Sequence, residues 1–282
     1  MRPALLLLPL FVSLLLQFHQ RAHADCEPAT CGNLTVRYPL LLSGSTHAYC
    51  EPATCGNLTV RYPFWLSGSN QSSSPCGHPA FQVWCSDDGS VASLGGSAIH
   101  VLGVDYSNNS FVASHTRISG ANGVCRTDFN MSSTIALSTF TISRRNRALC
   151  FLYNCSGTMP EPPIGGGYVN ATSNCSTPVF VYLSGSYNWD SPPAIATGQC
   201  SFTYVPVLGP EAEAMTAANY SRLLDDGFVM EWEPAAVGNC SACNASGGQC
   251  RYDNAAAALA CLCSDGNLKG STCATDGESH SH

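Results

Sequence analysis

Charged side chains are scarce in this chain: Asp, Glu, Lys and Arg together make up 11% of its 282 residues, against about 25% in an ordinary soluble domain. There is a single lysine, Lys269, and the formal net charge is −7. A protein that binds nucleic acid presents a basic surface to the phosphates, so this composition argues against a nucleic-acid partner. Long apolar runs are also missing after the first two dozen residues, so we expect no membrane span in the mature chain.

The one long apolar run lies at the start of the chain. Arg2 precedes a stretch rich in Leu, Pro, Phe and Val over residues 4–16, and the sequence AHA at 22–24 offers a small-x-small cleavage site. This pattern is typical of a secretory signal peptide over residues 1–24. We therefore expect a secreted, extracellular protein whose mature chain begins at Asp25.

Cysteine, in contrast, is abundant, with 17 residues. In the oxidising compartment that a signal peptide implies, the first interpretation is a disulfide framework and not metal ligation. Because the count is odd, at least one thiol is free, is paired between chains, or is an addition to the framework.

N-linked glycans would keep the surface hydrated where charged side chains are scarce, because they are bulky and solubilising. The chain holds eleven N-x-S/T sequons, some of them beside cysteines, and we expect about half of them to be occupied. The sequons are at Asn33, Asn57, Asn70, Asn108, Asn130, Asn154, Asn170, Asn174, Asn219, Asn239 and Asn244.

Short stretches of alternating apolar residues, separated by clusters of Gly, Asn, Ser and Pro, predict a mainly β fold. One short helix is expected over about 211–225, with Pro210 at its start and Gly227 as its C-terminal cap. The length of the mature chain predicts two small domains, divided between residues 125 and 150. The expected strands are 81–85, 98–104, 134–142, 148–154, 178–183, 201–208 and 228–232.

The densest cysteines lie between Cys240 and Cys273, with the spacing C-x2-C-x6-C-x10-C-x-C-x9-C. This segment resembles an epidermal-growth-factor-like (EGF-like) module. Its first pair, Cys240 and Cys243, matches half of a zinc site, but the secreted context favours disulfides. The preceding residues AVGN lack the set of acidic and amide groups of a calcium-binding version, so we expect no metal here.

Fourteen residues, CEPATCGNLTVRYP, occur twice, at 26–39 and at 50–63. The second copy continues into Phe64-Trp65 and a Cys-Gly motif at 76–77, whereas the first copy does not. The 24 residues from one copy to the next are too few to bury a core alone. We therefore expect residues 25–49 to be a poorly ordered partial duplicate of the domain start, whose deletion leaves folding and binding intact.

Several cysteine-anchored motifs follow one another in the chain: CGNLTVRYPFW (55–65), CGHPAFQVWC (76–85), LCFLYNC (149–155), CSFTYVPV (200–207) and DDGFVMEW (225–232). With the C-terminal cysteines they resemble the ectodomains of plant wall-associated receptor kinases, in particular the leaf-rust-resistance-locus type. The resemblance covers roughly residues 50–273. It implies a galacturonan-binding domain at 50–127, a wall-associated-kinase C-terminal domain at 140–273 with EGF-like cysteines at 240–273, and a tail at 274–282.

The same resemblance implies a framework of fourteen cysteines, with Cys150 as the odd residue. The framework consists of Cys50, Cys55, Cys76, Cys85, Cys125, Cys155, Cys175, Cys200, Cys240, Cys243, Cys250, Cys261, Cys263 and Cys273.

Catalytic motifs are lacking. The sequence holds no kinase glycine loop, catalytic loop or Asp-Phe-Gly, no serine nucleophile elbow and no His-Glu-x-x-His, and its eight histidines are scattered. Cys76 lies near His78 but has the family position of a half-cystine, which is not a thiolate. Asp87 and Asp88 precede Gly89 as in a hairpin turn and do not form a glycosidase pair. We expect no enzyme activity and no cofactor.

The resemblance implies a pectic ligand, meaning polygalacturonate or its oligomers. A site for a sugar acid needs cations or donors for the carboxylates and an aromatic face for the pyranose ring. The candidate binding residues are Arg61, Tyr62, Trp65, Arg117, Arg144, Arg145 and Arg147.

Each candidate has a structural alternative. In a strand Tyr62 and Phe64 point to the same side, so part of this aromatic stretch is expected to pack in the core, as are Phe81 and Trp84. The Arg144 cluster also fits a solvated loop before a strand. A different function is an interaction ectodomain that contacts a membrane receptor or an apoplastic protein in defence signalling without binding pectin. A third alternative is a non-functional truncated receptor product.

Overall fold

A computed structural model describes residues 50–67, 76–95, 99–115, 118, 123–125, 139–156, 168–171, 175, 177–188, 190–191, 200–213 and 217–273, and also 29–31 and 34–36. The expected signal peptide, most of 25–49, Arg117, the tail at 274–282 and the sequons Asn33, Asn70, Asn130 and Asn174 lie outside these residues. The chain divides into two compact units, 1–48 and 49–282, and each is considered by itself.

The two copies of the repeated segment form the same hairpin. In the first unit β1 (Ala29–Cys31) pairs with β2 (Leu34–Val36). In the second unit β3 (Ala53–Cys55) pairs with β4 (Leu58–Val60) in the equivalent antiparallel register. The turn after β3 begins at Gly56, whose φ of +57° suits a residue without a side chain. The repeated sequence is thus sufficient to specify the hairpin locally.

A sheet of seven strands is the main element of the second unit. The strand order is β10-β15-β9-β8-β7-β6-β5, and the neighbours are antiparallel except for the parallel pair β5–β6. The strands are β5 (Trp65–Leu66), β6 (Gln82–Cys85), β7 (Ala92–Leu94), β8 (Ile99–Asp105), β9 (Ser110–His115), β10 (Phe140–Ile142) and β15 (Phe228–Trp232). This arrangement confirms the predicted mainly β class.

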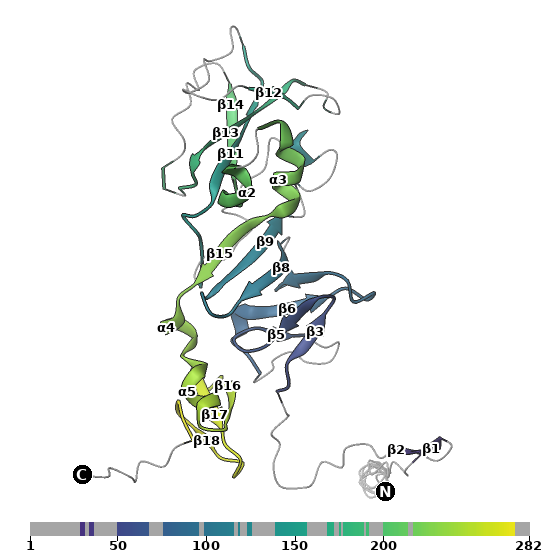
Figure 1. The fold of residues 1–282 in the computed structure, drawn as a ribbon, viewed down its shortest axis with the longest axis vertical. Helices are drawn as coiled ribbons and strands as arrows, with labels where there is room; N and C mark the ends of the chain where they lie inside the picture. The colour runs from purple at the N-terminus through teal and green to yellow at the C-terminus, as the bar shows by residue number, and fades with distance from the viewer. Residues whose placement is uncertain are drawn as a thin grey trace, which may run out of the picture. The chain divides into compact units, whose positions relative to one another are not determined.

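The seven-stranded sheet joins the two predicted domains. Strand β15, from the C-terminal part, lies between β9 and β10, and Figure 1 shows it running beside β9. The disulfide Cys125–Cys175 also links a residue of the predicted 50–127 domain to one of the predicted 140–273 domain. In the described part of the chain, the two stretches of sequence therefore share one sheet.

Both stretches also contribute to one aromatic core. Phe64 lies edge-on to Phe81, Phe111 and Trp232, with ring centroids 4.9, 5.6 and 5.4 Å away. Phe140, from β10, meets Phe81 at 4.7 Å. Edge-to-face pairs of this kind each add about 1 kcal/mol beyond the burial of apolar area. The core therefore stabilises the sheet across the predicted domain boundary.

A second sheet has the strand order β12-β13-β11-β14. Its strands are β11 (Arg147–Tyr153), β12 (Val169–Asn170), β13 (Val179–Ser186) and β14 (Ser201–Val207). Every residue of β11 from Ala148 to Tyr153 is buried, as the unbroken apolar run in that stretch predicts for a central strand covered on both faces.

The segment expected to be one helix contains several short elements. These are α2 (Gly209–Glu213), the 3₁₀ turn η6 (Ala217–Asn219) and α3 (Tyr220–Asp226). Asparagine competes for backbone hydrogen bonds and favours helix ends over helix interiors, so α3 begins directly after Asn219. Gly227 caps α3 with a φ of +85°, as predicted.

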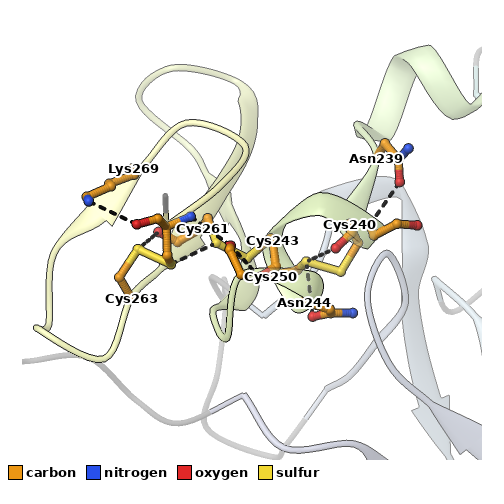
Figure 2. The surroundings of a disulfide bond; sticks show 11 residues. Asn239, Cys240, Cys243, Asn244, Cys250, Cys261, Cys263 and Lys269 are labelled. Atoms are coloured by element: carbon orange, nitrogen blue, oxygen red, sulfur yellow. Dashed lines mark hydrogen bonds between the residues drawn. A yellow bond between two sulfur atoms is a disulfide. The ribbon is translucent and has the colours of Figure 1, made fainter. Parts of the chain in front are cut away.

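The C-terminal cysteines form a small module of their own. It contains α5 (Cys240–Ala245), β16 (Gln249–Asp253), β17 (Ala258–Leu262) and β18 (Leu268–Lys269), and α4 (Pro234–Val237) connects it to β15 (Figure 1). Gly248 packs against the sulfur atoms: a Cβ at this position would lie 2.4 Å from Sγ of Cys261. The disulfides themselves fill the space that a hydrophobic core would occupy (Figure 2).

The fourteen cysteines implied by the resemblance form seven disulfides, and Cys150 is the free cysteine among the described residues. Cys150 is fully buried in β11, and burial raises the pKa of its thiol to about 12. A thiol that stays protonated is a poor nucleophile. The pairs are Cys50–Cys76, Cys55–Cys85, Cys125–Cys175, Cys155–Cys200, Cys240–Cys250, Cys243–Cys261 and Cys263–Cys273.

Two aromatic residues expected in the core lie in different environments. Phe81 is fully buried, as predicted, whereas Trp84 is 47% exposed, so the core interpretation is wrong for Trp84. Val83 is fully buried, and the next residue along β6 points to the opposite face of the sheet. The periodicity alone did not show which of the two faces would be covered.

Candidate ligand-binding site

A pocket of about 810 Å³ lies in the second unit, next to the second copy of the repeat. We call it the Arg61 pocket. It is lined by Cys76 and by residues from the stretches 50–52, 61–63, 106–109, 232–241, 244–250 and 262–264. Its walls thus come from the repeated segment, from the turn between β8 and β9, and from α4 with the disulfide module. The volume lies in the range of about 300–1,000 Å³ that is usual for small-ligand sites.

Arg61 is held against an aromatic ring in this pocket. Its guanidinium carbon lies 4.4 Å from the centroid of the Tyr106 ring. The Tyr106 hydroxyl accepts a hydrogen bond from the Arg61 backbone N–H at 2.9 Å and donates to the Thr59 carbonyl at 3.0 Å. The side chain of Arg61 is exposed. The cation is therefore oriented by stacking while its N–H groups stay accessible to a ligand.

Two polar contacts connect the repeated segment to α4 and to the disulfide module. The hydroxyl of Tyr62 donates to the carbonyl of Val237. The backbone N–H of Cys50 donates to Oε1 of Gln249 at 3.1 Å. Burial raises the pKa of Tyr62, and the neighbouring Tyr252 adds to this effect. Tyr62 therefore remains a protonated donor, and its bond holds two walls of the pocket together.

The pocket contains little charge other than that of Arg61. Among its described lining residues Arg61 is the cation and Glu51 the carboxylate, and the other polar groups are hydroxyls and amides, such as those of Ser107 and Asn109. Burial raises the pKa of Tyr106, so its hydroxyl is neutral at physiological pH. The arrangement offers one charge-assisted contact to an anion, together with neutral donors and acceptors for hydroxyl groups.

The turn beside Arg61 is fixed by an exposed carboxylate. Asp105 Oδ1 accepts hydrogen bonds from the backbone and the hydroxyl of Ser107 and from the backbone of Asn108. These bonds, first from Ser107 and then from Asn108, lower the pKa of Asp105 to about 2. The carboxylate therefore stays ionised, and the turn that carries Tyr106 into the pocket keeps its shape in mildly acidic solution.

Trp65 does not reach the pocket. It is 5% exposed, and its indole N–H donates to the carbonyl of His78 at 3.0 Å. Gly77 packs directly on it, since a Cβ there would lie 2.5 Å from Cδ1 of Trp65. The aromatic stretch is thus partly core, in agreement with the structural alternative for these residues, and Trp65 offers no free ring face to a sugar.

Arginines 144, 145 and 147 do not line the Arg61 pocket. Arg147 donates from Nε to the carbonyl of Ser184 at 2.9 Å and from Nη1 to that of Ala212 at 3.1 Å, which is a structural role. Arg145 pairs with Glu231 at 3.1 Å. Arg144 is exposed.

The turn that carries these arginines is tied to the sheet by Asn146. This side chain is fully buried and makes three hydrogen bonds of 2.8 Å, one to Ser143 and two to Val229. The turn thus holds β10 and β11 against β15. Of the seven candidate binding residues, the structure brings Arg61 and Tyr62 together in one site.

Tyr106, Asn109, Asn239, Asn244 and Gln249 line the pocket but were not among the candidates. Nothing in the sequence near Tyr106 shows that it contacts Arg61, because the two residues lie 45 positions apart. The sequons did mark Asn239 and Asn244 as surface residues.

A cluster of sulfur atoms in the disulfide module has the spacing of a metal site. Sγ atoms of Cys261, Cys263 and Cys273 lie within 4.8 Å of one another. However, Cys261 is bonded to Cys243, and Cys263 to Cys273. Metal ligation by cysteine requires a thiolate, so these sulfur atoms serve as packing and cross-links.

Comparison with known families agrees with this architecture. Residues 50–115 match the family model described as wall-associated receptor kinase galacturonan-binding, and residues 170–266 match the one described as wall-associated receptor kinase C-terminal. The chain is therefore a disulfide-rich, mainly β protein with two segments similar to domains of the wall-associated receptor kinase class. Both matched domains are extracellular and non-catalytic in type.

Within this class the chain resembles the leaf-rust-resistance-locus type. It is 28% identical over 252 residues, 88% of its length, to the leaf rust 10 disease-resistance locus receptor-like protein kinase-like 1.2 of Arabidopsis thaliana. It is also 28% identical over 200 residues, 67% of its length, to the leaf rust 10 disease-resistance locus receptor-like protein kinase-like 2.1 of the same plant. The chain spans about a third of the length of these relatives, 33% and 30%. No solved structure matches it significantly.

None of the helices in the described part of the chain is long and apolar enough to cross a membrane.

Proposed function

We propose that this protein is secreted to the plant cell wall and binds pectin, as polygalacturonate or its oligomers, in the Arg61 pocket. The observation that carries the proposal is the exposed guanidinium of Arg61, stacked on Tyr106 inside a domain that matches a galacturonan-binding family. A galacturonate residue carries one carboxylate on a ring of hydroxyl groups. Arg61 matches the carboxylate, and the hydroxyls and amides around it match the ring substituents.

The electrostatics of the pocket support binding of an acidic sugar even though the chain as a whole is acidic. Guanidinium groups form short, directional hydrogen bonds with carboxylates. Arg61 makes no ion pair with any carboxylate among the described residues, so its charge is available to a ligand. A ligand that binds through one charge pair at a partly open site should lose affinity as salt screens the interaction.

A direct test compares charged and neutralised ligands. Short oligogalacturonides and their fully methyl-esterified forms would be titrated into secreted, oxidised protein, with and without calcium, at low and high salt. We expect binding of the acidic form only, weakened by salt. The double variant R144Q/R145Q should bind like the wild type, since these residues lie outside the pocket. Equal binding of both ligand forms would contradict recognition of the carboxylate.

A second candidate function is association with a membrane receptor. Trp84 on β6 and Leu102 on β8 are 47% and 50% exposed, so the seven-stranded sheet presents two large apolar side chains that a protein partner would cover. Retained association with a receptor by a protein that fails to bind any pectic ligand would favour this alternative.

A further inference from the structure

Two glycosylation sequons lie on the wall of the Arg61 pocket. Asn239 and Asn244 line it and are both exposed. The other described sequon asparagines do not line the pocket; they are Asn57, Asn108, Asn154, Asn170 and Asn219. Figure 2 shows Asn239 at the start of α5 and Asn244 near its end. A glycan on either residue would therefore be attached at the pocket itself.

The hydrogen bonds of Asn239 are compatible with a glycan. Its Oδ1 accepts the backbone N–H of Ser241 at 2.9 Å and so caps α5. In N-glycosylation the amide Nδ2 displaces the pyrophosphate from C1 of a lipid-linked oligosaccharide. The new N–C bond replaces the C–O bond, and one Nδ2 proton is lost. Oδ1 remains an acceptor throughout, so the helix cap survives the modification. The sequon of Asn244, Asn-Ala-Ser, has no cysteine in its middle position.

We propose that N-linked glycans at Asn239 and Asn244 determine the size of ligand that the Arg61 pocket admits. This inference rests on the proposed function of the pocket. A tethered oligosaccharide is bulky and occupies the space around its attachment site. It therefore competes for space with a long polymer that has to pass across the opening. A short oligomer or a chain end can enter beside it and reach Arg61.

The test uses secreted, glycosylated protein and two probes, long-chain polygalacturonate and a short oligogalacturonide. The variant S241A/N244Q removes both sequons; S241A keeps the Asn239 side chain and its cap. Ser246 stays unchanged because its hydroxyl accepts the N–H of Cys273 at 2.8 Å. The matched control N57Q/N219Q removes two sequons away from the pocket. Intact-mass analysis measures the occupancy of each site.

We expect S241A/N244Q to bind the long polymer about tenfold more tightly than the wild type, with an unchanged affinity for the short oligomer. The control should match the wild type with both ligands. Unmodified Asn239 and Asn244 in the wild type, or equal polymer affinity in S241A/N244Q and wild type, would overturn the inference while leaving pectin binding intact. Absence of binding to either ligand by every variant would overturn the proposed function, and the inference with it.

Discussion

The two copies of CEPATCGNLTVRYP have the same sequence and form the same hairpin, but they belong to different compact units of the chain. The first belongs to the unit of residues 1–48 and the second to that of 49–282. In the second copy Cys50 and Cys55 are bonded to Cys76 and Cys85. Arg61 and Tyr62 contact residues of the same unit that are far along the chain. Local sequence thus specifies the hairpin, whereas the site depends on the residues that surround it.

This comparison predicts that equivalent substitutions in the two copies have unequal effects. The largest difference should come from the cysteines. Removing the Cys55–Cys85 disulfide with C55S/C85S should lower the free energy of unfolding of the 49–282 unit by about 2–5 kcal/mol, as is typical of small secreted domains. The matched variant C26S/C31S should leave that transition unchanged. Denaturant unfolding of both variants measures the difference, and equal losses would contradict the distinction between the copies.

A smaller difference is expected at the glycines of the two hairpins. Gly56 has a φ of +57°, and a Cβ there would lie 3.2 Å from the carbonyl oxygen of Ser90. An L-residue in this conformation costs about 1–2 kcal/mol, so G56A should destabilise the 49–282 unit by that amount. G32A, at the equivalent position of the first copy, should not change the unfolding of this unit. A destabilisation by G32A as large as that by G56A would show that the copies are equivalent.

The sequence predicts those parts of the fold that depend on local pattern. Strands with clear alternation or long apolar runs, such as β8 and β11, lie where the sequence predicts them. The Gly227 cap is equally local. The position of β15 between β9 and β10 was not predictable from local pattern. It depends on the pairing of β15 with β9, which lies more than 100 residues earlier in the chain. The shared core of Phe64, Phe140 and Trp232 was not predictable either, because it also depends on contacts between residues that lie far apart in the sequence.

The candidate site was predictable only in part. The residue types and the family resemblance were enough to name Arg61 and Tyr62 as candidates. That Trp65 is covered while Trp84 is exposed depends on which sheet face is packed, and an alternating pattern does not specify that. Arg147 is as basic as Arg61 in the sequence, but its Nε and Nη1 are bound to backbone carbonyls. Charge alone therefore does not distinguish a binding residue from a structural one.

The central claim is that the second copy carries the ligand site and the first does not. The most direct test measures oligogalacturonide affinity by titration calorimetry for R61Q, for the equivalent variant R37Q of the first copy, and for a chain lacking residues 25–48. We predict that R61Q weakens binding at least about tenfold, the loss of roughly one charge-assisted hydrogen bond. R37Q and the deletion should bind like the wild type. Equal binding by R61Q and wild type, or a loss in R37Q as large as in R61Q, would contradict the claim.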